Sequence, residues 1–593
     1  MVDRRASSTA PPTLTSGDPD VPSVRSGTTD RTGGRRGVRI AGLIGLLIAV
    51  AFILSPIVRA SLAAFQDATE FGSFTGVWTL VHIRKVLTTS EYLVPLGNTM
   101  VLAVSVTVGS LLVGGVLAWS LGRVRNLPLR RSLEVLVVIP FFLSPFTTAI
   151  AWVILLAGRA GLINVTLREQ LGLDLGLDIF SAWGVIFVMI VSFTPIAYLG
   201  IVNAVRGIDS QLEEAAAVAG STRLTSLRTV VLPLLRPAIL SSGMLVFILA
   251  AEIYTVPGYL GTPARYTSFP YAIIQDMTSF PIQRGPAAAG GLVLLVITLI
   301  GMLVYRRSTR QAHRYVTIGG KGTRQEGVEL GAWRWAPFSF AAAYILLALV
   351  LPVAGLVAGS LQRFFGAPLQ SGNYDTAVLF SVLSSPQVLD AVRNTAVVAV
   401  LAGVVATLVA LLISYVSLRT RVPGRVALDV SASLPLAVPG VVIGLGFLWL
   451  YVRTPLYGTV MLLVLVNVIR WLPFGMGVTR TGLLQVGPEL EESARVSGAS
   501  NAVLLRDIIV PVLRTTLLSS FLFIAIMAVK ELAASLLLVN PRNRVLAVET
   551  WNAAQAGTYN AAAALALVQV AMLLGLFLVA RLGFKIDLAA QRR

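Results

Sequence analysis

Apolar runs of roughly 20 residues recur along almost the whole chain, and they limit its possible folds more than any other feature. A run of that length crosses the ~30 Å hydrocarbon core of a bilayer as one helix. Within a bilayer every backbone polar group must find its partner inside the protein, so only helices and closed barrels can span it. Of the 593 residues, 55% are hydrophobic and 13% are charged, whereas ordinary soluble domains have ~25% charged residues. We therefore expect an all-α polytopic membrane protein.

About 12 transmembrane helices can be placed, six in each half of the chain. The expected spans of the first half are Val38–Ala60, Thr99–Leu121, Leu133–Leu156, Ala182–Val202, Ala238–Val256 and Gly290–Tyr305. Those of the second half are Trp335–Ala358, Thr395–Leu418, Val426–Val452, Val460–Thr479, Thr515–Val539 and Ala561–Leu582. The predicted organisation is a disordered cytoplasmic tail (1–37), a first repeat of six helices (38–305), a basic cytoplasmic linker (306–334), a second six-helix repeat (335–583) and a cytoplasmic C-terminal tail (584–593).

A polar segment interrupts this apolar pattern twice. It occupies Gln211–Ile239 and returns without a gap as Glu489–Leu517, 278 positions later. The residues that recur in the first copy are Leu212, Glu213, Glu214, Ala216, Val218, Gly220, Leu227, Arg228, Pro233, Leu235 and Arg236. Such a constant register indicates an internal duplication.

Clusters of arginine set the expected orientation, because loops rich in Lys and Arg stay in the cytoplasm. They are Arg123, Arg125, Arg130 and Arg131; Arg306, Arg307, Arg310, Arg314, Lys321 and Arg324; and Arg419, Arg421 and Arg425. With an even number of spans in each half, both polar segments and both termini are expected on the cytoplasmic side. The halves are then parallel repeats about an axis along the membrane normal.

A second match between the halves precedes each polar segment. Asn98-Thr99 and Asn394-Thr395 open equivalent spans, and the proline-rich runs 139–145 and 434–440 follow them. Proline frees backbone carbonyls within a span, which is tolerated where protein or a water-filled cavity satisfies them. These runs are expected either to line a pathway or to be kinks that improve packing.

Each polar segment predicts a bent pair of helices. Asp209–Ala219 should form a short helix with acidic residues in its first turn, where the helix dipole favours them. Gly220, and Gly498 in the second copy, should end this helix. Ser221 or Thr222, and Ser500 in the second copy, can cap the next helix. Glu213 and Glu214 could simply stabilise a helix end; alternatively, the two rigid elbows are what a symmetric cytoplasmic motor would grip.

The spacing of Glu-Ala-Ala, Gly and hydrophobic-Pro resembles the signature cytoplasmic loop of permease subunits of bacterial ATP-binding cassette (ABC) importers. The resemblance covers both halves and implies the type I ABC importer permease fold and a bacterial inner-membrane location. It also implies that the elbows dock onto an ATPase subunit, through Glu213, Glu214, Ala216, Gly220, Glu491, Glu492, Ala494 and Gly498. Ser493 and Arg495 depart from the small apolar residues common in the family, which puts equal docking of the two elbows in doubt.

The residues for catalysis within this chain are few. It has no cysteine and two histidines, His82 and His313. Residues that could serve as a thiolate nucleophile, a metal ligand or a histidine acid–base catalyst are therefore almost absent. The run 319–323 lacks the spacing of a phosphate-binding G-x-x-x-x-G-K-[ST] loop. No catalytic residue, metal ligand or cofactor is therefore expected here, and ATP and Mg should be bound by a separate ATPase. Two copies of it are expected because the chain supplies two elbows, and nucleic acid is not an expected partner.

Charges inside the expected spans are costly and usually functional. Glu252 and Lys530 occupy equivalent positions of the two halves, and Glu531 follows Lys530. We expect them to line the translocation route or to form a gate pair across the pseudo-twofold axis. A structural ion pair, or a place in the outer interface, is the alternative.

The fused architecture most resembles the ferric-iron uptake permeases, with an extracytoplasmic receptor as the implied second partner. The residues that carry this are Glu252–Pro257, the linker Arg314–Gly322 and Val529–Ser535. Fused importers for thiamine and organophosphonates share the layout, and the sequence offers no cluster of hard ligands for Fe(III). A twelve-helix secondary transporter driven by an ion gradient is the alternative from another class.

Overall fold

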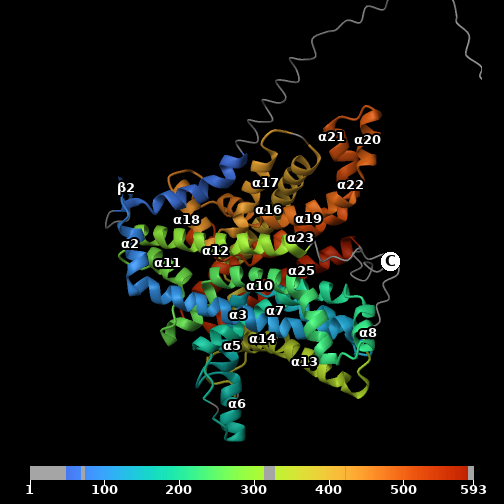
Figure 1. The fold of residues 1–593 in the computed structure, drawn as a ribbon. Helices are drawn as coiled ribbons and strands as arrows, with labels where there is room; N and C mark the ends of the chain where they lie inside the picture. Colours follow the sequence, from blue (N-terminus) through green and yellow to red (C-terminus); the bar gives the residue numbers. More distant parts are fainter. Residues whose placement is uncertain are drawn as a thin grey trace, which may run out of the picture.

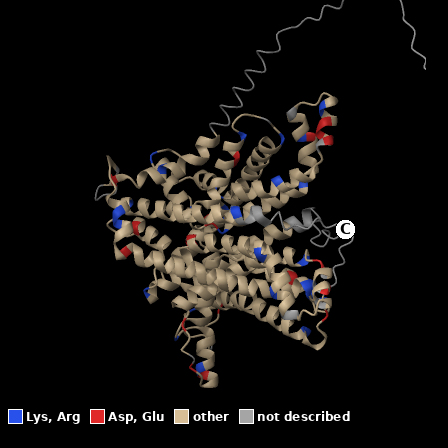
Figure 2. Cartoon of the chain, viewed as in Figure 1, with Lys and Arg blue, Asp and Glu red and all other residues tan. Residues whose placement is uncertain are grey.

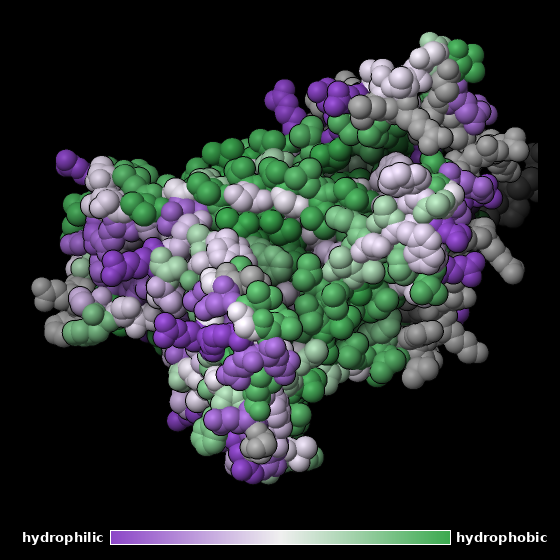
Figure 3. Space-filling view, turned by 90° about the horizontal axis from the view of Figure 1, so that it is seen from below, coloured by the Kyte–Doolittle hydropathy of each residue, from purple (hydrophilic) through white to green (hydrophobic). Residues whose placement is uncertain are grey.

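Helices make up most of the computed structural model, which describes residues 49–68, 74–174, 176–312, 328–370, 372–420 and 422–584. The described strands form one antiparallel pair, β1 (Gln66–Ala68) and β2 (Phe74–Trp78). Among the described residues, eight helices are long and apolar enough to cross a membrane, or up to eleven spans if each of three bent pairs is counted as one. Charged side chains gather at opposite ends of the molecule (Figure 2), and a broad apolar band lies between polar regions (Figure 3). The all-α polytopic prediction is confirmed.

The described first half contains the following elements after β2. They are α2 (Val81–Thr88), α3 (Ser90–Arg123), α4 (Arg130–Val138), η1 (Ile139–Phe142), α5 (Pro145–Leu156), α6 (Leu162–Leu171), α7 (Ala182–Arg206), α8 (Ser210–Val218), α9 (Arg223–Ser226), η2 (Leu227–Val231), α10 (Leu232–Glu252), η3 (Pro257–Gly261), η4 (Thr262–Ala264), α11 (Phe269–Thr278) and α12 (Arg284–Ala312).

The second half begins with the short turn η5 (Gly331–Arg334). It continues with α13 (Trp335–Ile345), η6 (Leu346–Val350), α14 (Leu351–Leu361), α15 (Thr376–Leu383), α16 (Pro386–Arg419), α17 (Arg425–Ser433), η7 (Leu434–Ala437), α18 (Gly440–Tyr451), α19 (Val460–Gln485), α20 (Pro488–Val496), α21 (Asn501–Val503), η8 (Leu504–Ile509), α22 (Val510–Val512), α23 (Arg514–Val529), η9 (Ser535–Leu537), α24 (Leu546–Gln555) and α25 (Tyr559–Phe584).

The duplication is visible as matched hydrogen bonds. In the first half the backbone N–H of Phe269, at the start of α11, donates to Thr99 Oγ1 on α3 at 2.8 Å. In the second half the N–H of Leu546, at the start of α24, donates to Thr395 Oγ1 on α16, also at 2.8 Å. These bonds align α3 with α16 and α11 with α24, so the two halves share one architecture.

Several expected spans are broken rather than continuous. The spans predicted at 133–156 and 426–452 are each two helical segments bent by 97° and 112°, at the proline runs. The spans predicted to continue to Val256 and Val539 were wrong at their ends, because α10 stops at Glu252 and α23 at Val529. The first expected span, Val38–Ala60, begins outside the described residues; its described part belongs to the apolar helix Ala49–Ala63.

The tails at 1–37 and 585–593 and most of the linker, residues 313–327, also lie outside the described residues. The end of the linker is described: the N–H of Val328 donates to the carbonyl of Arg123 at 2.8 Å. This bond attaches the linker to the end of α3. The division of the chain into domains otherwise stays a prediction.

The first helix of each half packs against the other half. Within α14, Gly355 and Gly359 contact Leu155 and Ile154 of α5. In the same way, the N-terminal helix Ala49–Ala63 packs against the second half. Its Ile53 belongs to a cluster with Ala410, Ile413, Leu428, Ala432, Leu472 and Met476. The two repeats are therefore interlocked by exchanged helices.

Gly446 on α18 lies directly against the backbone of the N-terminal helix. A Cβ added at this position would overlap the backbone carbonyl of Pro56. We expect Gly446→Ala to lower the midpoint of thermal unfolding of the purified protein, since overpacking of this kind typically costs about 1–3 kcal/mol. Gly115→Ala is the matched control, because nothing lies within 4 Å of an added Cβ there. Equal midpoints for the two variants would contradict the packing described here.

Candidate functional site

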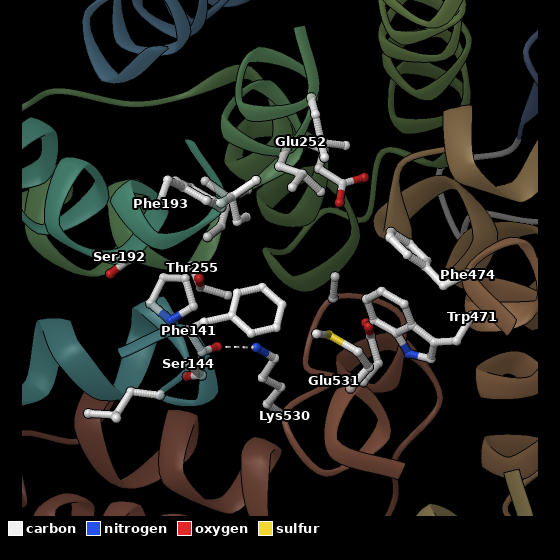
Figure 4. A pocket seen from close by; sticks show the side chains of 18 of the residues that line it. Phe141, Ser144, Ser192, Phe193, Glu252, Thr255, Trp471, Phe474, Lys530 and Glu531 are labelled. Atoms are coloured by element: carbon white, nitrogen blue, oxygen red, sulfur yellow. Dashed lines mark hydrogen bonds between the residues drawn. The ribbon is translucent and has the colours of Figure 1, made fainter. Parts of the chain in front are cut away.

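A cavity of about 520 Å³ lies between the two halves. Its walls come from α7 and α10 of the first half, from α19 and α23 of the second, and from the proline-rich bend before α5. Figure 4 shows side chains from both halves converging on it. The first proline run thus lines a cavity through Phe141 and Leu143–Phe146, whereas the lining contains no residue of the second run, 434–440.

The lining is organised as pairs of equivalent residues from the two repeats. Each pair is separated by the same 278 positions as the polar segments. The pairs are Ser192 and Arg470, Phe193 and Trp471, Ile196 and Phe474, Leu245 and Phe523, Leu249 and Met527, Glu252 and Lys530, Ile253 and Glu531, Tyr254 and Leu532, and Thr255 and Ala533. Tyr254 Oη even donates to the carbonyl of its own equivalent, Leu532, at 3.3 Å. The cavity therefore lies on the pseudo-twofold axis.

Three charged side chains meet at the wall of the cavity. Arg470 Nε lies 2.7 Å from Glu531 Oε2, and Arg470 Nη2 lies 3.1 Å from Glu252 Oε1. We call Arg470, Glu252 and Glu531 the triad. All three side chains are largely buried, where an ion pair is kept only if its remaining polar atoms are also bonded.

The helix breaks supply those remaining bonds. Because α23 ends at Val529 and α18 begins at Gly440, the backbone N–H groups of Ala534 and Gly440 are not used in helices. The N–H of Ala534 donates to Glu531 Oε1 at 2.9 Å, and the backbone of Gly440 hydrogen-bonds to Glu252. The triad is thus a hydrogen-bonded contact between α10 of the first half and the second half.

Lys530 makes a separate contact between the halves. Its ammonium donates to the carbonyl of Phe141 at 2.8 Å and lies 4.5 Å from the centroid of the Phe141 ring. Figure 4 shows this bond beside Glu531. The carbonyl is available because η1 ends at Phe142 and the chain turns before α5.

The structure brings Glu252, Lys530 and Glu531 to one cavity, and their role as pathway or gate residues stays a prediction. In the part of the chain that the structure describes, Glu252 pairs with Arg470 and not with Lys530. Sequence reasoning missed Arg470, although it is the sole charged residue of the span predicted at 460–479. The rule that charges within spans are functional would have found it.

Each polar segment folds as the expected elbow. α8 and α20 end at glycines with positive φ, +82° at Gly220 and +85° at Gly498. The N–H of the next residue donates five residues back, Ser221 to Ala216 at 2.9 Å and Ala499 to Ala494 at 3.0 Å. This is the Schellman arrangement, so the prediction that these glycines end the helices is confirmed.

The second helix of each elbow also begins as expected. Thr222 Oγ1 accepts from the N–H of Thr225 at 3.3 Å, and Ser500 Oγ from the N–H of Val503 at 3.3 Å. The first elbow then continues through η2 into α10, whereas the second bends by 75° between α22 and α23. The two elbows are alike at their tips and differ at their bases.

The elbow side chains divide into a bracing face and an exposed face. Glu491 is buried and lies 3.2 Å from Arg419 Nε, while Ala216 and Ala494 are half-buried. Glu214 and Glu492 are exposed, and the side chain of Glu213 lies outside the described residues. On the exposed face, which the site prediction left out, Val218 is 91% and Val496 90% exposed. These equivalent valines are the most exposed large apolar side chains described in the two elbows.

The elbows and the helices α2 and α11 lie at opposite ends of the molecule (Figure 1). We call these the elbow end and the far end. α10 starts near the elbow end and ends at Glu252 of the triad. Its 21 residues give a helix about 30 Å long, at 1.5 Å per residue. The cavity residues Ser241 and Gly200 lie nearer to the elbows than the triad does, so the cavity extends from the triad toward the elbow end.

Comparisons of the sequence with known proteins identify one family. The sequence pattern described as "binding-protein-dependent transport system inner membrane component" matches twice, at residues 110–314 and 406–587, together well over half of the chain. The chain is 25% identical over 550 residues to an Fe(3+)-transport system permease protein of Haemophilus influenzae, covering 91% of this chain and 98% of that one. It is also 25% identical over 455 residues to a ferric transport system permease protein of Actinobacillus pleuropneumoniae, covering 74% of this chain and 64% of that one. A solved bacterial ABC transporter chain, involved in the import of the acidic polysaccharide alginate, matches with a TM-score of 0.39 and 18% identity, over 48% of this chain and 98% of that one.

Proposed function

Because the chain belongs to the family of binding-protein-dependent transport system inner membrane components, and is thus a multi-pass permease subunit of an ABC importer, we propose that it imports ferric iron. The cargo is delivered by an extracytoplasmic receptor, and a separate ATPase supplies the energy. In this proposal the elbow end is cytoplasmic, as are both termini, and the far end is external. The observation that carries the proposal is the placement of a largely apolar cavity, with a few charged side chains on its wall, on the pseudo-twofold axis of a chain whose two halves each carry an elbow with the same tip.

The two elbows are the proposed ATPase docking sites, one for each of two ATPase copies. Val218 and Val496 are the protruding apolar tips, and the glycine turns behind them hold each tip at a fixed angle. The ion pair between Glu491 and Arg419 joins the second elbow to α16. A force applied at α20 is therefore transmitted to the spans rather than absorbed by a loose loop.

The triad, the Tyr254–Leu532 bond and the Lys530–Phe141 bond together are the proposed outer gate. All three connect the two halves at the same end of the cavity. Since the cavity extends from them toward the elbows, the proposed state is closed to the outside. Closure of the ATPases would separate the halves at the gate and open the cavity to the receptor.

Ferric iron is the proposed cargo because the two ferric permeases resemble the chain over most of its length. We expect cells that lack this chain to lose receptor-dependent uptake of radiolabelled ferric iron and to keep thiamine uptake. A loss of thiamine uptake with normal iron uptake would agree with the assignment as an importer permease and would contradict ferric iron as its cargo. Uptake that continues after ATP depletion, and stops when the proton gradient is dissipated, would favour the secondary transporter instead.

A further inference from the structure

A second cavity, of about 270 Å³, lies at the far end of the first half. It is formed where the start of α3 meets the end of α11, and Glu91, Tyr92, Gln275, Asp276 and Gln283 are among its polar lining residues. In the proposed orientation it faces outward, and α3 separates it from the elbow end. By its place in the fold it belongs neither to the central cavity nor to the docking tips.

Asp276 is a buried carboxylate without a cationic partner among the described residues. Its side chain lies on the cavity wall, and Asp276 is 8% exposed. The phenol of Tyr92, only 1% exposed, donates to both carboxylate oxygens, at 2.9 and 3.2 Å. A buried carboxylate is costly unless it is paired or coordinates a metal, and a neutral phenol does not balance its charge.

The second half shows that the fold does not need this pair. The bond from Asn98 Nδ2 to the carbonyl of Thr267 has its counterpart from Asn394 to Arg544, which fixes the register between the halves. In that register Val388 takes the place of Tyr92 and Ala553 that of Asp276, and both belong to one hydrophobic cluster. The first half thus replaces an apolar contact with a phenol and a carboxylate that packing does not require.

Glu91 adds a second carboxylate at the mouth of the cavity. It lies 3.5 Å from the ammonium of Lys85, which also donates to Gln283 at 2.8 Å. Both Glu91 and Lys85 are partly exposed, so Lys85 can move away and leave Glu91 to another cation. Phenolate and carboxylate oxygens are the donors that hard metal cations select.

We propose that this cavity binds a hard metal cation through the oxygens of Tyr92, Asp276 and Glu91. On binding, the Tyr92 hydroxyl releases its proton to water and the cation takes its place against Asp276, while Lys85 leaves Glu91. Two sources share this chemistry: the ferric cargo arriving from the receptor, and a resident divalent cation such as calcium. Only the first of these rests on the proposed function.

The test uses the purified full chain in lipid nanodiscs, without ATPase or receptor. Ferric nitrilotriacetate is added and the visible phenolate-to-iron charge-transfer band is recorded; in parallel, sensitised terbium emission is titrated with calcium. We expect the iron band in the wild type and its loss in Tyr92→Phe and in Asp276→Ala, the latter installing the residue of the second half. Tyr266→Phe removes a half-buried phenol of the same region, bonded to the carbonyl of Asn98, and should keep the band.

An iron band identifies the cargo as the source, and terbium emission displaced by calcium without an iron band identifies a resident divalent cation. Either signal supports the site only if Tyr92→Phe removes it. Persistence of the signal in both variants, or no signal in the wild type, overturns the proposal. Because the readout is binding, it stands apart from cellular iron uptake, whose loss or survival tests the proposed function alone.

Discussion

Replacement of Arg470 by methionine is expected to abolish uptake of the cargo while the chain still reaches the membrane. The variant leaves Glu252 and Glu531 buried without their shared counter-charge, and breaking a buried ion pair on one side typically costs about 3–5 kcal/mol. If that loss falls on the closed gate, the balance between closed and open states shifts by roughly 100-fold or more. Uptake of radiolabelled ferric iron and co-purification of the ATPase would be measured together.

Two further variants separate a gate from a merely structural ion pair. Arg480→Met is the matched control, because Arg480 lies on the same helix α19 and its partner Asp429, at 3.2 Å, is away from the cavity. The triple variant Glu252→Gln, Arg470→Met, Glu531→Gln removes all three charges, which buried sites often tolerate. Normal uptake by the triple variant would mean that the triad only stabilises the fold, and the proposed gate would be wrong.

Replacement of Gly220 and Gly498 together by valine is expected to uncouple transport from ATP hydrolysis. Nothing lies within 4 Å of an added Cβ at either position, so the effect comes from the backbone alone. A left-handed conformation costs an ordinary L-residue roughly 1–2 kcal/mol, more for a β-branched one. The turn would open and carry Val218 and Val496 away from the docking surface. The measurements are ATPase co-purification and the ratio of cargo imported to ATP hydrolysed.

The matched variant replaces both glycines with asparagine, which tolerates the left-handed region. It adds a side chain of similar size but permits the same turn, so near-normal coupling is expected. Equal loss in the asparagine and valine variants would point to side-chain crowding against the ATPase. Full coupling in the valine variant would count against the elbows as the site of force transfer.

The elbows could be predicted because their structure is local. A short amphipathic helix, a glycine in the left-handed region and a hydroxyl cap are determined by residues within about ten positions of each other, and the duplication repeated the signal. The exposed Val218 and Val496 were part of that repeated pattern. Their exposure could not be read from it, because it depends on how α8 and α20 stand away from the bundle.

The triad and the Lys530 contact could be predicted only in part, because they depend on where helices end and on contacts between distant segments. Hydropathy continues past Glu252 and Val529, so the spans were drawn too long and the free N–H groups that bond the triad were not foreseen. The pairing of Arg470 with Glu252 joins residues 218 positions apart, and no periodicity reports such a contact. The residue of the first half that is equivalent to Arg470 is Ser192, so comparison of the two halves did not indicate a charged residue at this position.

The exchanged first helices also determine the order in which this protein can be built. The helix Ala49–Ala63 emerges early from the ribosome, yet its partners on α16, α17 and α19 are synthesised several hundred residues later. Until then its apolar face has only lipid or a chaperone to cover it, a situation in which multi-segment proteins become prone to misassembly. The α5 surface likewise waits for α14. Neither half can therefore complete its fold alone, and a ribosome that stalls between the two repeats should yield a product that the membrane quality-control proteases degrade.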